Sequence, residues 1–172
     1  GLSIIAAARA QAAALVALAR GRFDEADRHI DEVARMAGDD PMFALGVPWQ
    51  RAIVATWRGD ATSALELSDP ILPFSPYPRQ ATLARALLDR DLGDRDAARR
   101  GFAEGWADGP GTVTRDWMYT GTVSLMAELA ADLGTEAQAA ELDAVLEPFD
   151  GQFLLEACLS LRGSVSWLRA RL

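Results

Sequence analysis

Apolar residues recur with helical spacing along most of the chain. After Gly21 they occur at intervals of three and four residues, which places them on one face of a helix. The same spacing appears in residues 118–133 and 142–149. These patterns predict helices over residues 2–20, 23–37, 42–58 with a break near Pro48, 60–69, 78–92, 94–107, 115–133, 135–148 and 163–172.

The segments between these helices have other features. Residues 69–79 contain four prolines, which lack a backbone N–H and restrict the residue before them, so we expect an extended loop there. No run of any length shows the alternation typical of a strand. Residues 150–162 have no clear period and fit either a short helix or an extended connection.

A helix–turn–helix unit recurs along the chain. It is clearest at Gly21-Arg22-Phe23-Asp24-Glu25-Ala26, and weaker copies begin at Gly59, Gly93 and Gly134. The glycines lie 38, 34 and 41 residues apart, and a period near 34 with such a turn is typical of tetratricopeptide repeats. The sequence therefore predicts an all-α fold. We expect one tetratricopeptide-like domain over residues 1–172, with about four helical hairpins in a right-handed superhelical array and a C-terminal helix.

Charge and cysteine content narrow the possible partners. The net charge is −8, the chain has no lysine, and eleven acids stand against the single Arg115 between Glu104 and Glu156. Nucleic-acid binding needs cations that neutralise phosphates, so we expect no direct nucleic-acid contact. Cys158 is the only cysteine, which excludes an internal disulfide and favours a reducing, cytoplasmic compartment. Arg9 within the apolar run at residues 2–19 argues against a membrane span.

The residues that could carry catalysis are sparse. His29 is the only histidine, and although Glu25 and Glu32 share its helix face, a zinc site would lack sulfur or further imidazole ligands. Asp39 and Asp40 precede Pro41, a pattern typical of a helix cap with proline in the first turn. We therefore expect no enzymatic activity, no cofactor and no metal.

Tryptophan spacing suggests a binding surface. Trp49, Ile53 and Trp57 fall four residues apart and share one helix face. By the same register Leu83, Leu87 and Arg90 would extend that surface into a concave groove, where the tryptophans would contact an extended peptide and Arg90 an anionic group. The alternative is that both tryptophans fill space between neighbouring repeats, since aromatic core residues are common.

The last third of the chain resembles a known family. The residues that carry the resemblance are Arg115-Asp116-Trp117, Leu125, Ala127-Glu128, Leu133-Gly134, Leu146, Pro148-Phe149, Gly151, Cys158 and Gly163-Ser164-Val165. They resemble the C-terminal helical region of actinobacterial LuxR-type regulators, in which a signal-transduction ATPase module precedes a tetratricopeptide-like array. Arg95 and Glu136 depart from the pattern, because a repeat would place its corner aromatic there.

The resemblance implies a regulatory interaction module of a transcriptional regulator. Its groove would bind a protein segment or small effector and influence neighbouring ATPase and output domains of the parent chain. A structural spacer or dimerisation array is the alternative, and an all-α enzyme is a third. We also expect this chain to be a fragment, in which the apolar stripe of Val165, Leu168 and Leu172 begins an incomplete repeat.

Overall fold

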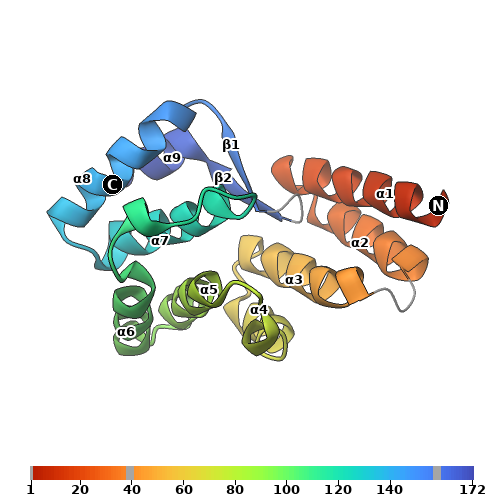
Figure 1. Cartoon of the computed structure of the whole chain (residues 1–172). Coiled ribbons are helices and arrows are strands. Elements are labelled where there is room, and N and C mark those ends of the chain that lie inside the picture. Colours follow the sequence, from red (N-terminus) through yellow and green to blue (C-terminus); the bar gives the residue numbers. More distant parts are fainter. Residues whose placement is uncertain (1, 38–40, 157–159) are drawn as a thin grey trace. The chain divides into compact units, whose positions relative to one another are not determined.

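The computed structural model describes residues 2–37, 41–156 and 160–172, and this part of the chain is mostly helical (Figure 1). The predicted helical class is thereby confirmed. The α-helices are α1 (Leu2–Ala19), α2 (Phe23–Ala37), α3 (Pro41–Trp57), α4 (Ala61–Ser68), α5 (Pro78–Asp91), α6 (Arg95–Trp106), α7 (Tyr119–Leu133), α8 (Glu136–Leu146) and α9 (Val165–Arg169). Short 3₁₀ turns are η1 (Leu72–Phe74), η2 (Pro110–Thr112) and η3 (Glu147–Phe149), and two strands are β1 (Phe153–Glu156) and β2 (Ser160–Ser164).

The described chain divides into two compact units. Unit 1 contains the residues up to Ile71 together with Ser160 and Leu161, and unit 2 contains residues 72–156 and 162–172. Each unit is built largely from helical hairpins, namely α1–α2 and α3–α4 in unit 1 and α5–α6 and α7–α8 in unit 2. The prediction of one domain over residues 1–172 stays a prediction.

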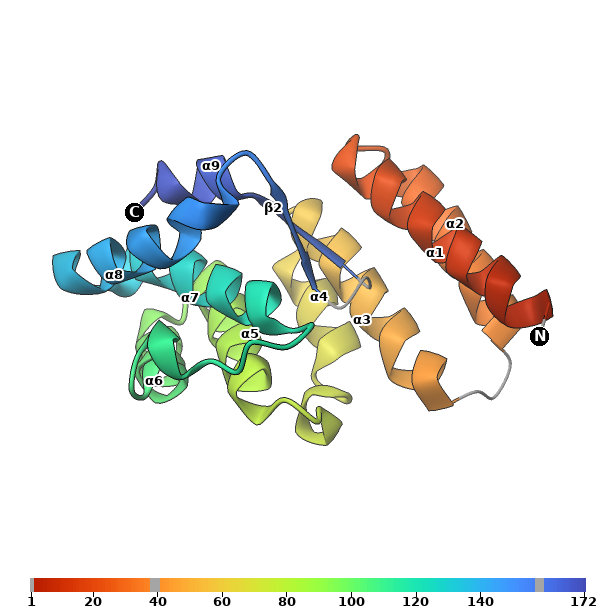
Figure 2. The ribbon, with the colours of Figure 1, turned by 45° about the horizontal axis from the view of Figure 1, so that its top comes forward.

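Unit 1 rests on close packing of small side chains. Helices α1 and α2 lie side by side (Figure 2). The buried face of α1 is almost entirely alanine, and it meets the branched side chains Ile30 and Val33 of α2. Alanine allows the two backbones to approach, so the larger residues of α2 fill the space between them. Val54 of α3 and Leu161 complete this core.

Helix α7 is the central element of unit 2. Its side chains Leu125, Met126 and Leu129 are fully buried, and α5, α6, α8, α9 and β1 all pack against it (Figure 1). A helix apolar on every side is stable only when neighbours surround it. The predicted start at residue 115 is too early, because residues 115–118 form the turn that precedes α7.

Three of the four predicted turns share one backbone geometry. Gly21, Gly59 and Gly93 have φ of +69°, +76° and +90°, a region that glycine enters without steric cost. The residue after each glycine donates its N–H to a carbonyl five residues earlier, as from Arg22 to Ala17 at 2.9 Å. Gly134 differs, with φ of −81°, and the next helix instead begins with a capping box between Thr135 and Gln138.

Two local predictions are wrong. Helix α3 runs through Pro48 without a break, because one lost hydrogen bond within 17 residues is outweighed by packed neighbours such as Val47 and Ile53. The expectation of no strand is also wrong, since β1 and β2 form a two-stranded sheet. Strands this short give little periodic signal, and β1 gains its stability by burying Leu154 and Glu156 against α7.

The C-terminal apolar stripe has its partners within the chain. Only residues 165–169 are helical, and the residues before them belong to β2. Val165 and Leu168 are buried where α9 packs against α7 and α8. Two of the three apolar side chains of the stripe are thus covered within unit 2 and Leu172 is half-buried, and the expectation that the stripe begins an incomplete repeat stays a prediction.

A first prediction concerns Gly101, which lies where α6 crosses α5. A Cβ atom at Gly101 would be 2.8 Å from the Cβ of buried Ala86. Gly101→Ala should therefore lower the unfolding free energy by about 1–2 kcal/mol, although alanine favours a helix by about 1 kcal/mol. Chemical denaturation measures the change. Gly111→Ala is the control, since nothing lies within 4 Å of that site, and adding Ala86→Gly to the first variant should restore stability. Unchanged stability in Gly101→Ala would contradict the packing.

Candidate functional site

Three of the six predicted groove residues lie in the hydrophobic core. Ile53 is buried in unit 1, and Leu83 and Leu87 are buried in unit 2. A ligand could reach these side chains only by unpacking the core, so the structure corrects their assignment as groove-lining residues. Their helical register was right, but each lies on the face that packs against neighbouring helices.

The other three predicted groove residues have partners of their own. Trp49 is half-buried against the core of unit 1. Trp57 is 43 % exposed, and its indole N–H donates to the Leu161 carbonyl at 3.0 Å. The Arg90 guanidinium pairs with Asp132 at 2.8 Å and with Asp91 at 2.6 Å. Because two carboxylates already neutralise Arg90, it is not a free cation for an anionic ligand.

A different set of aromatic side chains is exposed in unit 2. We define the aromatic patch as Tyr77 and Trp117 together with Phe74. The Tyr77 and Trp117 rings meet edge to face, with centroids 6.5 Å apart, and the Trp117 indole N–H donates to the Tyr77 hydroxyl. Phe74 lies three residues before Tyr77 in the same segment. Phe74 is 74 % exposed and Trp117 is 65 % exposed, so the patch offers large apolar surfaces to solvent.

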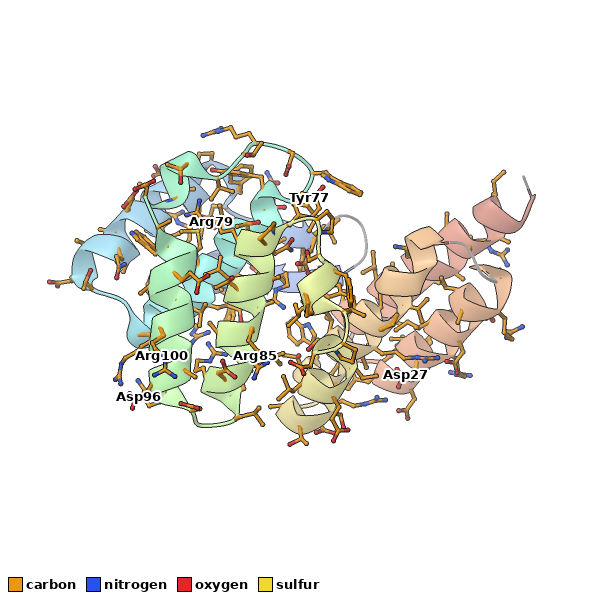
Figure 3. The ribbon with its side chains drawn as sticks, turned by 60° about the horizontal axis from the view of Figure 1, so that its bottom comes forward. Asp27, Tyr77, Arg79, Arg85, Asp96 and Arg100 are labelled. Atoms are coloured by element: carbon orange, nitrogen blue, oxygen red, sulfur yellow. The ribbon has the colours of Figure 1, made fainter. Side chains whose placement is uncertain are left out.

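The proline-rich segment positions the first half of the patch. Its central residues form the turn η1, which carries Phe74. The Tyr77 N–H donates to the Ser75 hydroxyl at 3.1 Å, and Pro78 then begins α5 in the first turn, where its missing N–H costs no helical hydrogen bond. Tyr77 is thus fixed at the N-terminal end of α5 (Figure 3).

A short turn before α7 positions the second half. The Asp116 carboxylate accepts the Met118 N–H at 2.8 Å, and the Tyr119 N–H donates to the Asp116 carbonyl at 3.2 Å. The Arg115 guanidinium lies over the Tyr119 ring, 5.3 Å from its centroid. Trp117 is held between these contacts, so its exposed ring projects from an ordered backbone.

Arg79 connects α5 to the loop that leads toward Trp117. Its guanidinium donates to three backbone carbonyls, those of Gly105 and Trp106 at 2.7 Å and Gly109 at 2.8 Å, and to the Thr112 hydroxyl at 2.9 Å. Arg79 lies beside Tyr77 at the start of α5 (Figure 3). Burial lowers the pKa of Arg79 from its ordinary value, and Asp108 opposes this change. The side chain therefore satisfies carbonyls at the end of α6 and shapes the loop that follows.

A second group of polar residues is buried where residues of β1 and β2 meet α7 and α5. The Arg162 guanidinium lies 3.5 Å from the Glu128 carboxylate, and its Nε and Nη2 atoms make no hydrogen bond within the described residues. Nearby, Gln80 donates to Glu156, which packs against α7 where Gly121 has no side chain. These groups are enclosed by the fold, between the strands and α7.

Burial controls the ionisation of Glu128. Removing this carboxyl group from water raises its pKa above the ordinary value of 4.5, and the nearby Arg162 and Arg90 only partly oppose the change. A buried carboxylate is costly unless it is well paired. The 3.5 Å separation and the unbonded nitrogens of Arg162 show that this pairing is incomplete.

The remaining sequence candidates form no second site among the described residues. The His29 Nδ1 atom lies 3.3 Å from a Glu32 carboxylate oxygen in a part-buried contact on α2. Across the described ranges, no group of three or more His, Cys, Asp or Glu residues is arranged to hold a metal ion. Asp39, Asp40 and Cys158 lie outside the described residues. None of the helices in the described part is long and apolar enough to cross a membrane.

Comparison with protein-family models, with curated proteins and with solved structures finds no match for this chain. The aromatic patch therefore rests on the geometry alone. Sequence reasoning missed it because Phe74 and Tyr77 lie in a segment without periodicity and Trp117 lies forty residues later. The available signal was the presence of aromatic residues between prolines, which is unusual for a solvated loop.

A second prediction tests how the patch is held in place. Arg79→Met removes four hydrogen bonds from a charged donor and leaves backbone carbonyls without partners. The unfolding free energy should fall by about 2–4 kcal/mol, and amides in residues 107–118 should exchange faster with deuterium. Arg100→Met is the matched control, because Arg100 is exposed on α6 and forms no polar contact within the described part (Figure 3). If the amides of residues 107–118 exchange with deuterium at the same rate in both variants, the role of Arg79 is contradicted.

A third prediction follows from the raised pKa of Glu128. The folded protein binds this proton more tightly than the unfolded chain, so the contribution of Glu128 to stability is fully present below pH 4.5 and is lost as pH rises through the folded pKa. Relative to Glu128→Gln, the wild-type melting temperature should therefore fall as pH is raised from about 4 to 7. Glu136→Gln, at an exposed position, should give a curve parallel to wild type. If the melting temperature of wild type instead rises with pH relative to Glu128→Gln, the ion pair with Arg162 outweighs the cost of burying the Glu128 carboxylate.

Proposed function

We propose that this chain is a non-catalytic interaction module, a tetratricopeptide-like helical repeat that binds a protein segment. The observation that carries the proposal is the aromatic patch, in which Trp117 is 65 % exposed while hydrogen bonds fix the backbone on both sides of it. The helical hairpins of each unit support the tetratricopeptide-like arrangement. Three of the four hairpins, which turn at Gly21, Gly59 and Gly93, share a glycine turn typical of such repeats.

The energetics of the patch favour binding over a purely structural role. An exposed tryptophan that is already ordered loses little conformational entropy when a partner covers it. Tryptophan and tyrosine are also the side chains that most often dominate the affinity of interfaces. A spacer has no reason to hold such rings in solvent, where they promote aggregation.

The chemistry of the patch favours an extended apolar or proline-containing segment. Aromatic surfaces of this kind bind such segments because an extended chain is already close to its bound conformation. The three aromatic side chains of the patch carry no charge, and of the arginines in the adjoining segments Arg79 donates to carbonyls while Arg115 lies over the Tyr119 ring. We therefore expect apolar contacts to supply most of the binding free energy. An anionic effector fits this surface less well.

The sequence resemblance supplies the proposed biological setting. In this proposal the chain is part of a LuxR-type regulator, and binding at the patch influences neighbouring ATPase and output domains of the parent chain. The acidic charge of the module agrees with a role that leaves nucleic-acid contact to other domains. A cytoplasmic location belongs to the same proposal.

A fourth prediction tests binding at the patch. Selection of a phage-displayed random peptide library on the wild-type protein should enrich sequences with apolar or aromatic anchors. Trp117→Ala should weaken the binding of the selected peptides by at least about tenfold, measured by fluorescence anisotropy, because it removes the largest apolar surface of the site. The thermal stability of this variant should stay close to wild type, since the ring is mostly in solvent.

Trp167→Ala provides the matched control. Trp167 is half exposed on α9 and stacks with the Arg171 guanidinium at 4.8 Å, but it lies outside the patch. This variant should bind the selected peptides as wild type does. If the selected peptides bind Trp117→Ala as tightly as wild type, the binding site does not include the patch. If the library yields no binder, a structural spacer becomes the better-supported function.

A further inference from the structure

Helix α1 has a second apolar face that the described residues of unit 1 leave exposed. One side of α1 packs against α2 through Ala7, Ala10, Ala14 and Ala17. On the opposite side the exposed residues are Ile5, Ala8, Ala12, Val16 and Ala19. Ile5 is 69 % exposed and Val16 is 47 % exposed.

The spacing of this outer face is that of a helix contact. Its residues recur every three or four positions and so form a continuous stripe along α1. A surface helix normally carries polar residues on the side away from its core, and α2 does so. Helix α1 instead has apolar residues on two opposite sides, which is the pattern of a helix enclosed between two neighbours.

Charge distinguishes the possible occupants of this face. Arg9 and Arg20 lie along one edge of the outer stripe, about 16 Å apart along the helix axis. Both are exposed and neither forms an ion pair within the described residues. Helix α1 contains no acidic residue. A helix that covers the stripe and carries acids on the facing edge would therefore pair with both arginines.

A second copy of α1 does not meet this requirement. When two helices pack antiparallel, the same edge of each faces the other, so Arg9 of one copy would meet Arg20 of the other. Two like charges in contact are unfavourable. An antiparallel occupant that suits both arginines therefore differs from α1 in the charge of that edge.

We propose that the outer face of α1 docks an antiparallel amphipathic helix whose apolar stripe is flanked on one edge by acidic residues. Helix α2 covers the alanines on the other side of α1 with its apolar residues Ala26, Ile30 and Val33. Its aspartates Asp24, Asp27 and Asp31 pair with arginines on and just after α3, the first two with Arg58 and the third with Arg51, so an acidic edge of this kind suits arginines on a neighbouring helix. This docking face lies in unit 1, so it is distinct from the aromatic patch and independent of the proposed function.

The probe for this site is a peptide with the sequence of residues 22–37. A hydrocarbon staple between positions 28 and 32 holds it helical, since a free peptide of this length is only marginally helical in water. Both positions lie on the polar face, so the apolar stripe and the three aspartates stay intact. Fluorescence anisotropy of the labelled peptide with the intact protein should show saturable binding that weakens as salt is added.

A fifth prediction follows for variants of the outer face. Val16→Glu should weaken binding of the stapled peptide at least about tenfold, because it places a carboxylate in the apolar contact. The double variant Arg9→Glu, Arg20→Glu should weaken binding about three- to tenfold at low salt. A peptide with arginine in place of its three aspartates should bind this double variant better than it binds wild type.

Leu92→Glu is the matched control, since Leu92 is 42 % exposed and lies at the end of α5 in unit 2. It should leave binding of the stapled peptide unchanged. Absence of saturable binding up to about 1 mM peptide would overturn the proposal. Binding that persists in Val16→Glu would also overturn it, because the peptide would then be replacing α2 on the inner face. Self-association of the protein, abolished by Val16→Glu in sedimentation, would make a second copy the occupant and overturn it as well.

Discussion

Close approach of helix backbones is the constraint on which both units depend. In unit 1 the buried side of α1 consists largely of alanines, and the branched residues of α2 reach across to fill the space. In unit 2 the contact between α5 and α6 depends on Gly101 and Gly105, where an added Cβ would meet Ala86 or Leu83. Small residues on one helix and large residues on its partner give native packing density without long side chains. Glycine turns then join the paired helices of three hairpins, and a capping box begins the second helix of the fourth.

The use of small side chains in the helix contacts explains why several tryptophans lie at the surface. A core built from alanine, leucine and valine leaves little room for tryptophan, and Trp57, Trp117 and Trp167 each expose a large part of their surface. Trp117 lies in a turn that a hydrogen bond to Asp116 holds, where Arg115 lies over the Tyr119 ring and Arg79 shapes the preceding loop. An exposed ring on a fixed backbone is suited to recognition, since most of its entropy cost is already met by folding.

Buried charge contributes specificity to unit 2 more than stability. Arg162 and Glu128 are removed from water with an incomplete pairing, which costs free energy that an apolar pair would not. The group nevertheless lies where β2 meets α7, and Glu156 and Gln80 form a second polar contact under β1. Polar contacts of this kind restrict the register in which two short strands can dock on a helix. Four- and five-residue strands have too few side chains to set that register by apolar contact alone.

The sequence by itself determined the helices and their turns. Apolar spacing located α2, α5, α6 and α8 within two residues, and Gly21, Gly59 and Gly93 marked turns that only a positive φ allows. These features are local, because they depend on contacts between residues a few positions apart. Only the tertiary structure decided which face of each helix is covered. Leu83 and Leu87 share the register of a surface stripe but lie inside unit 2, whereas Tyr77 and Trp117 meet across forty residues of chain. Strands β1 and β2 could likewise not be predicted from the sequence, because their stability comes from packing on α7 and not from their own periodicity.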